Sequence, residues 1–388
     1  MLPRGVAALL LAVLVAAACG SDGEPEGPVE HTGSDDGFYE PPDPLPDGEH
    51  GDLLRYQRVD VTADAYRVLY LSESVPGEPI AVSGLVVLPS GGEGVRPVLS
   101  WAHGTTGLAD QCAPSKHPLG GRVSSLLVRF IERGWAVVAT DYEGLGTPGL
   151  HPYLAGISEG RGTLDIVRAA KQLPGAALAD DTVIWGHSQG GHAALFAHEL
   201  AGSWTPELRV RGTVAGAPPS ELPLIGAVGR DGFQGYLAMA VAGLNAAHPE
   251  AHLSSVLRDE AIARLVVLEQ GCADEVFARY NHLSYEDVAR PGGTTTEPWK
   301  SVLEKNDPGH VRVDSPLLII HGEADQVIPI EASRLLFERL CGLGQLVERR
   351  TYPGLGHGDV IESSFSDMVT WMDDRVAGQP AVTGCPTG

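Results

Sequence analysis

The pattern of apolar and polar positions changes character at about residue 97. From there to about residue 375, short apolar runs alternate with longer stretches whose apolar residues recur at helical spacing. This alternation predicts parallel strands joined by crossover helices, as in an open α/β sheet. The expected strands are 98–102, 136–140, 182–185, 210–215, 316–320 and 346–352. The expected helices are 122–133, 161–173, 190–201, 331–341 and 360–375.

Two segments of the chain do not follow this alternation. Residues 66–71 and 80–88 are strand-like runs separated by a turn at Pro76-Gly77, which predicts an antiparallel start to the sheet. The connection between the strands ending near 215 and starting at 316 is too long for a plain loop. We expect 223–308 to form an inserted helical cap over the active site, with the apolar stretch 236–244 as cap core or, as the alternative, an acyl groove.

The first fifty residues do not belong to the predicted core. Arg4 precedes an apolar run at 6–18 that is too short to span a bilayer and is typical of an export signal. Small residues directly before Cys19 predict a lipoprotein-type signal at 1–18 with lipid attached to Cys19; the alternative is an ordinary secretory signal. Residues 20–50 hold ten acidic residues and no Lys or Arg, so 19–50 is expected to be a flexible tether and 51–388 the folded domain.

The composition narrows the possible partners. The formal net charge is −23, and removing Arg4 and the ten tether acids leaves 26 basic and 40 acidic residues, a balance of −14. This balance opposes binding to nucleic acid or to an anionic membrane by charge. We therefore expect no nucleic-acid partner, and the export signal predicts an exported protein, which we expect to be a monomer. It would be anchored through Cys19 at the cell surface or periplasmic face, or otherwise secreted.

The five cysteines fit an exported protein. If Cys19 is lipidated, the remaining four allow three pairings in an oxidising compartment. We favour Cys112 with Cys272 and Cys341 with Cys385, since the second pair would fasten a C-terminal tail that has little core of its own. Free buried thiols are the alternative.

The segment 182–193 is the most informative in the chain. A β run leads into Gly186-His187-Ser188-Gln189-Gly190, and a helical pattern follows. This is the G-x-S-x-G nucleophile elbow, a sharp turn between strand and helix that exposes the serine. Glycines flank the turn because a Cβ there would collide with neighbouring backbone. We expect Ser188 to be a catalytic nucleophile.

A serine hydroxyl needs a base and a group that orients this base. Asp325 follows the run 317–320 in a loop, and His357 comes after the next strand among glycines. We predict that His357 takes the Ser188 proton and that Asp325 orients His357, with Glu323 as the rival orienter. The backbone N–H groups of Gln189 and Thr105 are the expected oxyanion hole, with Thr106 as the alternative to Thr105.

Several other polar residues near these motifs are given structural roles. His103, His187 and His192 are expected to be neighbours of the elbow rather than bases. The residues Asp141, Tyr142 and Glu143 are expected to set loop geometry, with lining of the pocket as the alternative. No H-E-x-x-H motif or ordered His and carboxylate cluster occurs, so we expect no catalytic metal.

Long loop sequences extend the match beyond the elbow. Residues 102–115, 141–149, 151–153 and 158–161 resemble the bacterial branch of the secretory lipase family, which includes yeast lipase A-like enzymes. The resemblance covers about 55–385. It implies an α/β-hydrolase fold with a helical cap, no cofactor, and hydrolysis of triacylglycerols and simpler esters. It also implies a triad at Ser188, Asp325 and His357, and a bridged Cys112.

The sequence therefore predicts an α/β-hydrolase fold with a mostly parallel central sheet and an inserted cap. The expected function is that of a lipase or carboxylesterase working through an acyl-enzyme. Two alternatives remain open: a serine peptidase of the prolyl oligopeptidase type, and a non-catalytic surface binding protein on a hydrolase scaffold.

Overall fold

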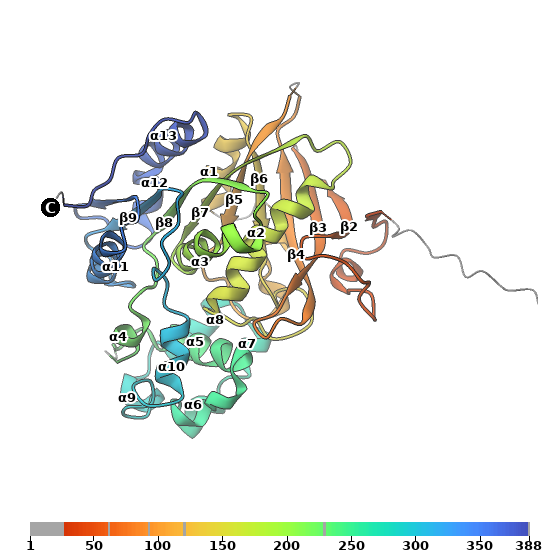
Figure 1. Cartoon of the computed structure of the whole chain (residues 1–388). Helices are drawn as coiled ribbons and strands as arrows, with labels where there is room; N and C mark the ends of the chain where they lie inside the picture. Colours follow the sequence, from red (N-terminus) through yellow and green to blue (C-terminus); the bar gives the residue numbers. More distant parts are fainter. Residues whose placement is uncertain (1–26, 61–62, 92–93, 119–121, 228–229, 387–388) are drawn as a thin grey trace, which may run out of the picture.

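The computed structural model describes residues 27–60, 63–91, 94–118, 122–227 and 230–386. Its centre is a ten-stranded sheet in the order β1-β2-β3-β4-β6-β5-β7-β8-β9-β10 (Figure 1). The strands are β1 (Val29–Glu30), β2 (Leu53–Val59), β3 (Asp64–Glu73), β4 (Pro79–Leu88), β5 (Arg96–Ala102), β6 (Ala136–Thr140), β7 (Leu178–His187), β8 (Arg209–Gly216), β9 (Leu317–Gly322) and β10 (Val347–Tyr352). From β6 to β10 in this order every neighbouring pair is parallel, whereas β2, β3, β4 and β6 pair antiparallel.

Helices cover both faces of the sheet (Figure 1). Apolar clusters place α2 and α3 with α11 on one face, and α1, α12 and α13 on the other. Their bounds are α1 (Arg122–Ile131), α2 (Gly156–Lys171), α3 (Gln189–Trp204), α11 (Ile330–Gly342), α12 (Asp359–Ser363) and α13 (Phe365–Val376). Because the parallel strands all run the same way, their carboxyl ends and the loops that follow meet at one edge of the sheet.

Two helices differ from the sequence prediction. Helix α2 begins five residues earlier than expected, at Gly156. Its glycines have low intrinsic helix propensity, but they allow α2 to lie directly against α3, and this packing extends the helix. A Cβ at Gly156 would overlap the Phe196 ring, and one at Gly160 would lie 2.9 Å from the Ala197 amide nitrogen. The single helix expected at 360–375 is divided in two at Ser364.

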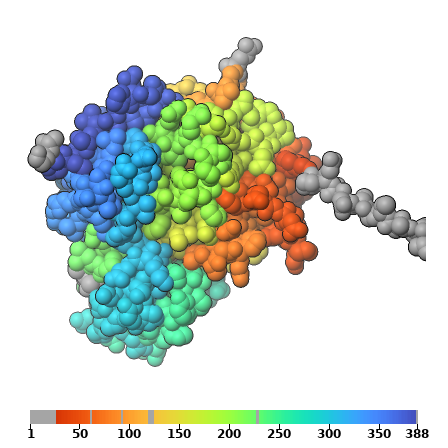
Figure 2. Space-filling model, viewed as in Figure 1, coloured from red at the N-terminus to blue at the C-terminus, as the bar shows by residue number. Residues whose placement is uncertain are grey.

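The expected flexible tether is wrong for residues 27–50, which pack against the domain. Phe38 is fully buried and Tyr39 is buried beside it, in a cluster with Leu69 of β3 and Ala81 of β4. The Tyr39 hydroxyl is 2.9 Å from the Ser115 hydroxyl, and β1 pairs parallel with β2 at the sheet edge. In Figure 2 this red segment lies against the body of the molecule. The tether was expected because the segment is rich in acidic residues. Two adjacent aromatic residues, Phe38 and Tyr39, nevertheless supply enough buried area to hold it against the domain. The predicted signal at 1–18 and Cys19 lie outside the described residues.

Between β8 and β9 the chain forms the inserted cap, which Figure 2 shows as a lobe at one end of the molecule. Its helices are α4 (Leu222–Ala227), α5 (Gln234–Ala247), α6 (Asp259–Ile262), α7 (Val267–Gln270), α8 (Ala273–Tyr280), α9 (Tyr285–Val288) and α10 (Trp299–Lys305), with 3-10 turns η4 (Pro249–Ala251) and η5 (Leu253–Ser255). Their shared apolar core includes Leu108 and Tyr153 to Ala155 of the sheet domain. The cap thus packs on loops at the carboxyl edge.

The structure contains two disulfides, Cys112–Cys272 and Cys341–Cys385. The first joins the loop after β5, with its 3-10 turns η2 (Asp110–Cys112) and η3 (Pro114–Lys116), to the start of α8. The second fastens the C-terminal tail to α11 beside β10. Within the described ranges, none of the helices is long and apolar enough to cross a membrane. Sheet order, parallel crossovers and inserted helices together are the α/β-hydrolase fold with a helical cap.

Candidate active site

Ser188 occupies a strained turn between β7 and α3. Its backbone lies at φ 59° and ψ −125°, a region that non-glycine residues rarely adopt. The Ser188 amide donates to the Gly216 carbonyl at 2.9 Å, which ties the turn to β8. The side chain therefore projects from the carboxyl edge at the start of a helix.

Close backbone packing explains the glycines of this turn. A Cβ at Gly190 would overlap the Ala102 carbonyl group at the end of β5, and a Cβ at Gly186 would overlap the Gly190 carbonyl. A Cβ at Gly191 would lie 2.6 Å from the Gly216 oxygen. Only glycine permits α3 to approach β5 and β8 this closely. The expected nucleophile elbow is thus present in the structure.

Asp325 and His357 meet in the loops after β9 and β10. His357 Nδ1 donates to Asp325 Oδ2 at 2.6 Å, which leaves Nε2 available to another partner. The rival orienter Glu323 is exposed and accepts a hydrogen bond from the Thr351 hydroxyl instead. The structure therefore brings Asp325, and not Glu323, to the imidazole.

The Asp325 carboxylate is held by four donors. Besides His357, the amides of Val327 and Ile328 donate to Oδ1 at 2.8 and 2.9 Å, and His321 Nε2 lies 3.1 Å from Oδ2. Burial alone would raise the pKa of Asp325, but the hydrogen bonds from His321 and His357 outweigh it and hold the pKa well below its usual range. Asp325 is thus a fixed anion that can stabilise an imidazolium.

The loop after β5 brings the two threonines near Ser188. A Cβ at Gly104 would lie 4.0 Å from the Ser188 Cβ, so this loop runs directly beside the nucleophile turn. The Thr105 hydroxyl is 2.6 Å from the Tyr153 hydroxyl, whereas the buried Thr106 hydroxyl has no partner among the described residues. The Cys112–Cys272 disulfide and a hydrogen bond from the Ala273 amide to the Thr106 carbonyl (2.8 Å) fasten the loop to the cap.

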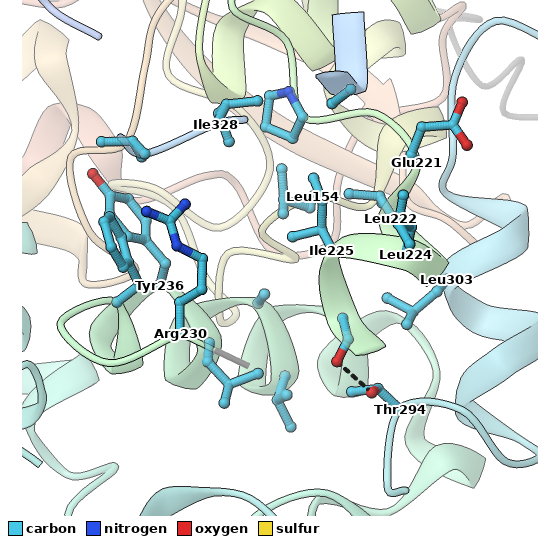
Figure 3. Close-up of a pocket in the computed structure, with 18 of the residues that line it drawn as sticks. Leu154, Glu221, Leu222, Leu224, Ile225, Arg230, Tyr236, Thr294, Leu303 and Ile328 are labelled. Atoms are coloured by element: carbon cyan, nitrogen blue, oxygen red, sulfur yellow. Dashed lines mark hydrogen bonds between the residues drawn. The ribbon is translucent and has the colours of Figure 1, made fainter. Parts of the chain in front are cut away.

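An apolar cavity of about 390 Å³ extends from Ser188 into the cap. Figure 3 shows Leu154, Leu222 and Ile225 in its wall, with Tyr236 near one end and Leu303 near the other. Of the stretch 236–244, five residues line this cavity: Tyr236, Leu237, Ala240, Val241 and Leu244. The stretch therefore serves both as cap core and as cavity wall.

A second, larger cavity of about 880 Å³ also has Ser188 in its lining. Its lining includes His357 together with Thr105 and Thr106, none of which lines the apolar cavity. It also includes polar residues absent from the first cavity, among them Gln111, His117 and Asp274. Ser188 and Tyr236 are the residues that line both cavities. The two cavities thus meet at Ser188.

The remaining predicted residues have structural contacts. Asp141 is buried and accepts hydrogen bonds from Ser83 and Ser115, and Tyr142 has a positive φ of 71°, so this loop has the expected geometric role. His192 is bonded to Glu159 and to the Asn306 carbonyl, away from Ser188. His187 lies beside His357 with 4.6 Å between ring centres, and burial followed by the His357 charge lowers its pKa to about 3. A base with so low a pKa would be neutral but weak.

Glu159, a fully buried acid beneath the elbow, was not among the predicted site residues. Burial would raise its pKa, yet hydrogen bonding and charge from His192 lower it, while Glu159 raises the pKa of His192 against its own burial. The signal in the sequence was its place in 158–161, one of the segments that resemble the family, just before the expected helix. Nothing there shows that the acid faces α3.

Comparisons with known proteins agree with this architecture. Residues 123–384 match the family model described as secretory lipase. The chain is 26% identical over 381 residues to the secreted triacylglycerol lipase LIP4 of Malassezia globosa, covering 90% of this chain and 83% of the relative. It is 26% identical over 393 residues to lipase A of Arthroderma benhamiae, covering 91% and 82%.

Solved structures share the fold. Lipase A of Candida antarctica in its closed state superposes with a TM-score of 0.78 at 22% identity, covering 90% of this chain and 87% of that one. The rice cell wall degrading esterase LipA of Xanthomonas oryzae, in a ligand-bound form, superposes with a TM-score of 0.70 at 21% identity, covering 85% and 97%.

Proposed function

The chain belongs to the secretory lipase family, and from this premise we propose that it hydrolyses carboxylic esters with Ser188 as nucleophile, His357 as base and Asp325 as orienter. One observation carries the proposal: the strained serine and the imidazole held by Asp325 face the same cavity at the carboxyl edge. A neutral hydroxyl becomes nucleophilic when such an imidazole accepts its proton.

The reaction follows from the proton positions. His357 Nε2 takes the Ser188 proton as the hydroxyl oxygen attacks the ester carbonyl, and Asp325 stabilises the imidazolium through Nδ1. The backbone N–H groups of Gln189 and Thr105 stabilise the oxyanion. The imidazolium then protonates the leaving alkoxide, and the acyl-enzyme forms. Water activated by the same imidazole releases the acid.

The two cavities would bind different parts of the substrate. His357 must lie next to the leaving oxygen in order to protonate it. The larger cavity, which His357 lines, therefore takes the alcohol part of the ester. The apolar cavity takes the acyl chain, because burying methylene groups there removes apolar surface from water. The Malassezia relative is named a triacylglycerol lipase. We extend this class, acylglycerols and simpler apolar esters, to the present chain.

The test is turnover of nitrophenyl esters of increasing acyl length by the purified protein. Ser188→Ala removes the nucleophile and is expected to abolish turnover and labelling by a fluorophosphonate probe. Ser203→Ala is the matched control, since Ser203 is exposed near the end of the same helix α3, where its hydroxyl donates to the Leu200 carbonyl. Full activity in Ser188→Ala would refute the mechanism. Absence of labelling in the wild type would favour a binding protein.

Export and anchoring are part of the proposal. Two disulfides suit an oxidising compartment, and the first fifty residues carry the export pattern. Lipid on Cys19 would hold the domain at a membrane. Cys19→Ser should move the protein from the detergent phase to the aqueous phase in a detergent partition assay and remove incorporation of labelled fatty acid. Unchanged partitioning would favour an ordinary secreted form.

A further inference from the structure

A buried polar group lies beneath the nucleophile turn and has no part in the proton transfers above. We call Glu159 of α2, Gln189 and His192 of α3, and His151 the Glu159 cluster; each of its four residues is no more than 1% exposed. Polar side chains buried this completely persist only when their hydrogen bonds are satisfied. Their bonds therefore show what the cluster holds in place.

The two hydrogen bonds of the His192 ring indicate its protonation state. Its Nδ1 is 2.9 Å from Glu159 Oε2, and its Nε2 is 2.8 Å from the Asn306 carbonyl oxygen. Both neighbours are acceptors, so both ring nitrogens donate and the ring is an imidazolium paired with the Glu159 carboxylate. The carbonyl belongs to the residue that ends α10, where the cap returns to the sheet. The pair thus joins the cap to helix α3.

The second carboxylate oxygen holds the residue after the nucleophile. Gln189 Nε2 donates to Glu159 Oε1 at 2.8 Å and to His151 Nε2 at 2.9 Å, so both of its hydrogens are used. His151 can accept because its Nδ1 donates to the Glu143 carbonyl at 2.8 Å. The side chain of Gln189 is therefore clamped, and with it the backbone N–H that follows Ser188.

The same oxygen also reaches the wall of the apolar cavity. The Leu154 amide donates to Glu159 Oε1 at 3.0 Å, and Leu154 lines that cavity. The Gly156 amide donates to the Asn306 side-chain oxygen at 3.0 Å. One carboxylate therefore connects the oxyanion residue, the acyl cavity and the cap.

We propose that Glu159 is a positioning residue for ester hydrolysis: through Gln189 and His192 it fixes the oxyanion N–H against the cap and the acyl cavity. This inference rests on the proposed function, since it assigns Gln189 its role in the oxyanion hole. Glu159 does not touch the reacting atoms. Its loss should therefore lower kcat more than it raises KM, because a displaced oxyanion donor acts in the transition state.

The test contrasts two substitutions at one position. Glu159→Leu removes the acceptors and is expected to lower kcat about 10- to 100-fold with KM changed less than about threefold. Glu159→Gln can keep every bond: its oxygen accepts from Gln189 and Leu154, while its amide donates to His192 Nδ1 in a neutral ring. It should retain kcat within about threefold of the wild type, by the strength of a neutral hydrogen bond. Equal losses in both variants would overturn hydrogen-bond positioning.

Two further variants keep the test decisive. Gln189→Met removes the clamped amide but keeps the backbone N–H and the Glu159–His192 pair, and it should lower kcat about tenfold. If Glu159→Leu does not fold, this variant alone decides. Glu199→Leu is the control, since Glu199 lies on α3 with Gln189 and accepts from the amides of Gly309 and His310, outside the Glu159 cluster. It should lower the melting temperature and leave kcat unchanged.

The outcomes separate this inference from the proposed function. Wild-type kcat in folded Glu159→Leu or in Gln189→Met, with Ser188→Ala inactive, would overturn the positioning role alone. A wild-type protein without ester turnover would overturn the proposed function itself.

Discussion

The carboxyl edge of the sheet and the cap over it are built by different interactions. At the edge, Ser188 and Asp325 are fixed by backbone approaches and by hydrogen bonds to buried groups. The cap holds together mainly through an apolar cluster around residues such as Met239 and Trp299. Directional bonds tolerate little displacement, whereas apolar packing tolerates exchange of side chains of similar volume. The difference predicts that changes at the edge affect the chemistry and changes in the cap affect the choice of substrate.

The strongest way to break the comparison is to remove the charge at Asp325. Asp325→Asn keeps the shape but presents an amide to His357 Nδ1, so it favours the wrong tautomer and cannot stabilise the imidazolium. We expect kcat to fall by about 10⁴-fold. Steady-state kinetics with a soluble ester measures it, and Glu323→Gln, whose side chain contacts Thr351, is the matched control. An equal loss in both variants would contradict the assignment.

The next largest effect concerns the close packing of α3 against β5 at Gly190. Gly190→Ala would push a methyl group into the Ala102 carbonyl and should cost more than about 3 kcal/mol of unfolding free energy, if the protein folds at all. Gly202→Ala, in the same helix with open space around it, should instead stabilise by up to about 1 kcal/mol. Urea unfolding compares the two. Similar stabilities would show that the elbow is not closely packed.

A cap substitution should change selectivity and leave the chemistry intact. Ile225→Trp fills the apolar cavity and is expected to lower kcat/KM about 10- to 100-fold for a long-chain ester. A short-chain ester should change by less than about threefold, because its acyl group stays near Ser188. Val266→Trp, on the exposed surface of the cap and outside this cavity, is the control. A uniform loss across chain lengths would place the acyl chain elsewhere.

The smallest predicted effect is a pH dependence of the unfolding free energy that comes from His198 of α3. Burial lowers the pKa of His198 to about 4, from an ordinary value of 6.5. Between these two values the unfolded chain binds a proton that the folded chain does not, so unfolding free energy decreases as pH falls through this window.

His198→Gln should remove about one proton from this linkage, a slope of about 1.4 kcal/mol per pH unit. Urea unfolding at pH 7, 6 and 5 gives the slope for each protein. Equal slopes for the variant and the wild type would show that His198 is not the group responsible. Replacement of exposed His282 in the cap by Gln is the control for exchanging a histidine outside the core.

The alternation of strands and helices, the turn at Ser188 and the order of Asp325 and His357 could all be predicted from the sequence. These features are local: a strand period, a glycine-flanked turn and loops after apolar runs are encoded by neighbouring residues. The same reasoning chose both cysteine pairings, though without excluding the other pairings. The inserted cap followed from the length of one connection.

Which distant groups lie together could not be predicted from the sequence and is seen in the folded chain. Phe38 and Tyr39 pack on β3 and β4 although composition predicted a tether, because two aromatic side chains can bury enough area to order an acidic segment. The structure also showed that Glu159 lies under the elbow and that Tyr236 borders both cavities. Such contacts depend on how helices pack across the sheet, and the periodicity of a single helix does not specify its partner.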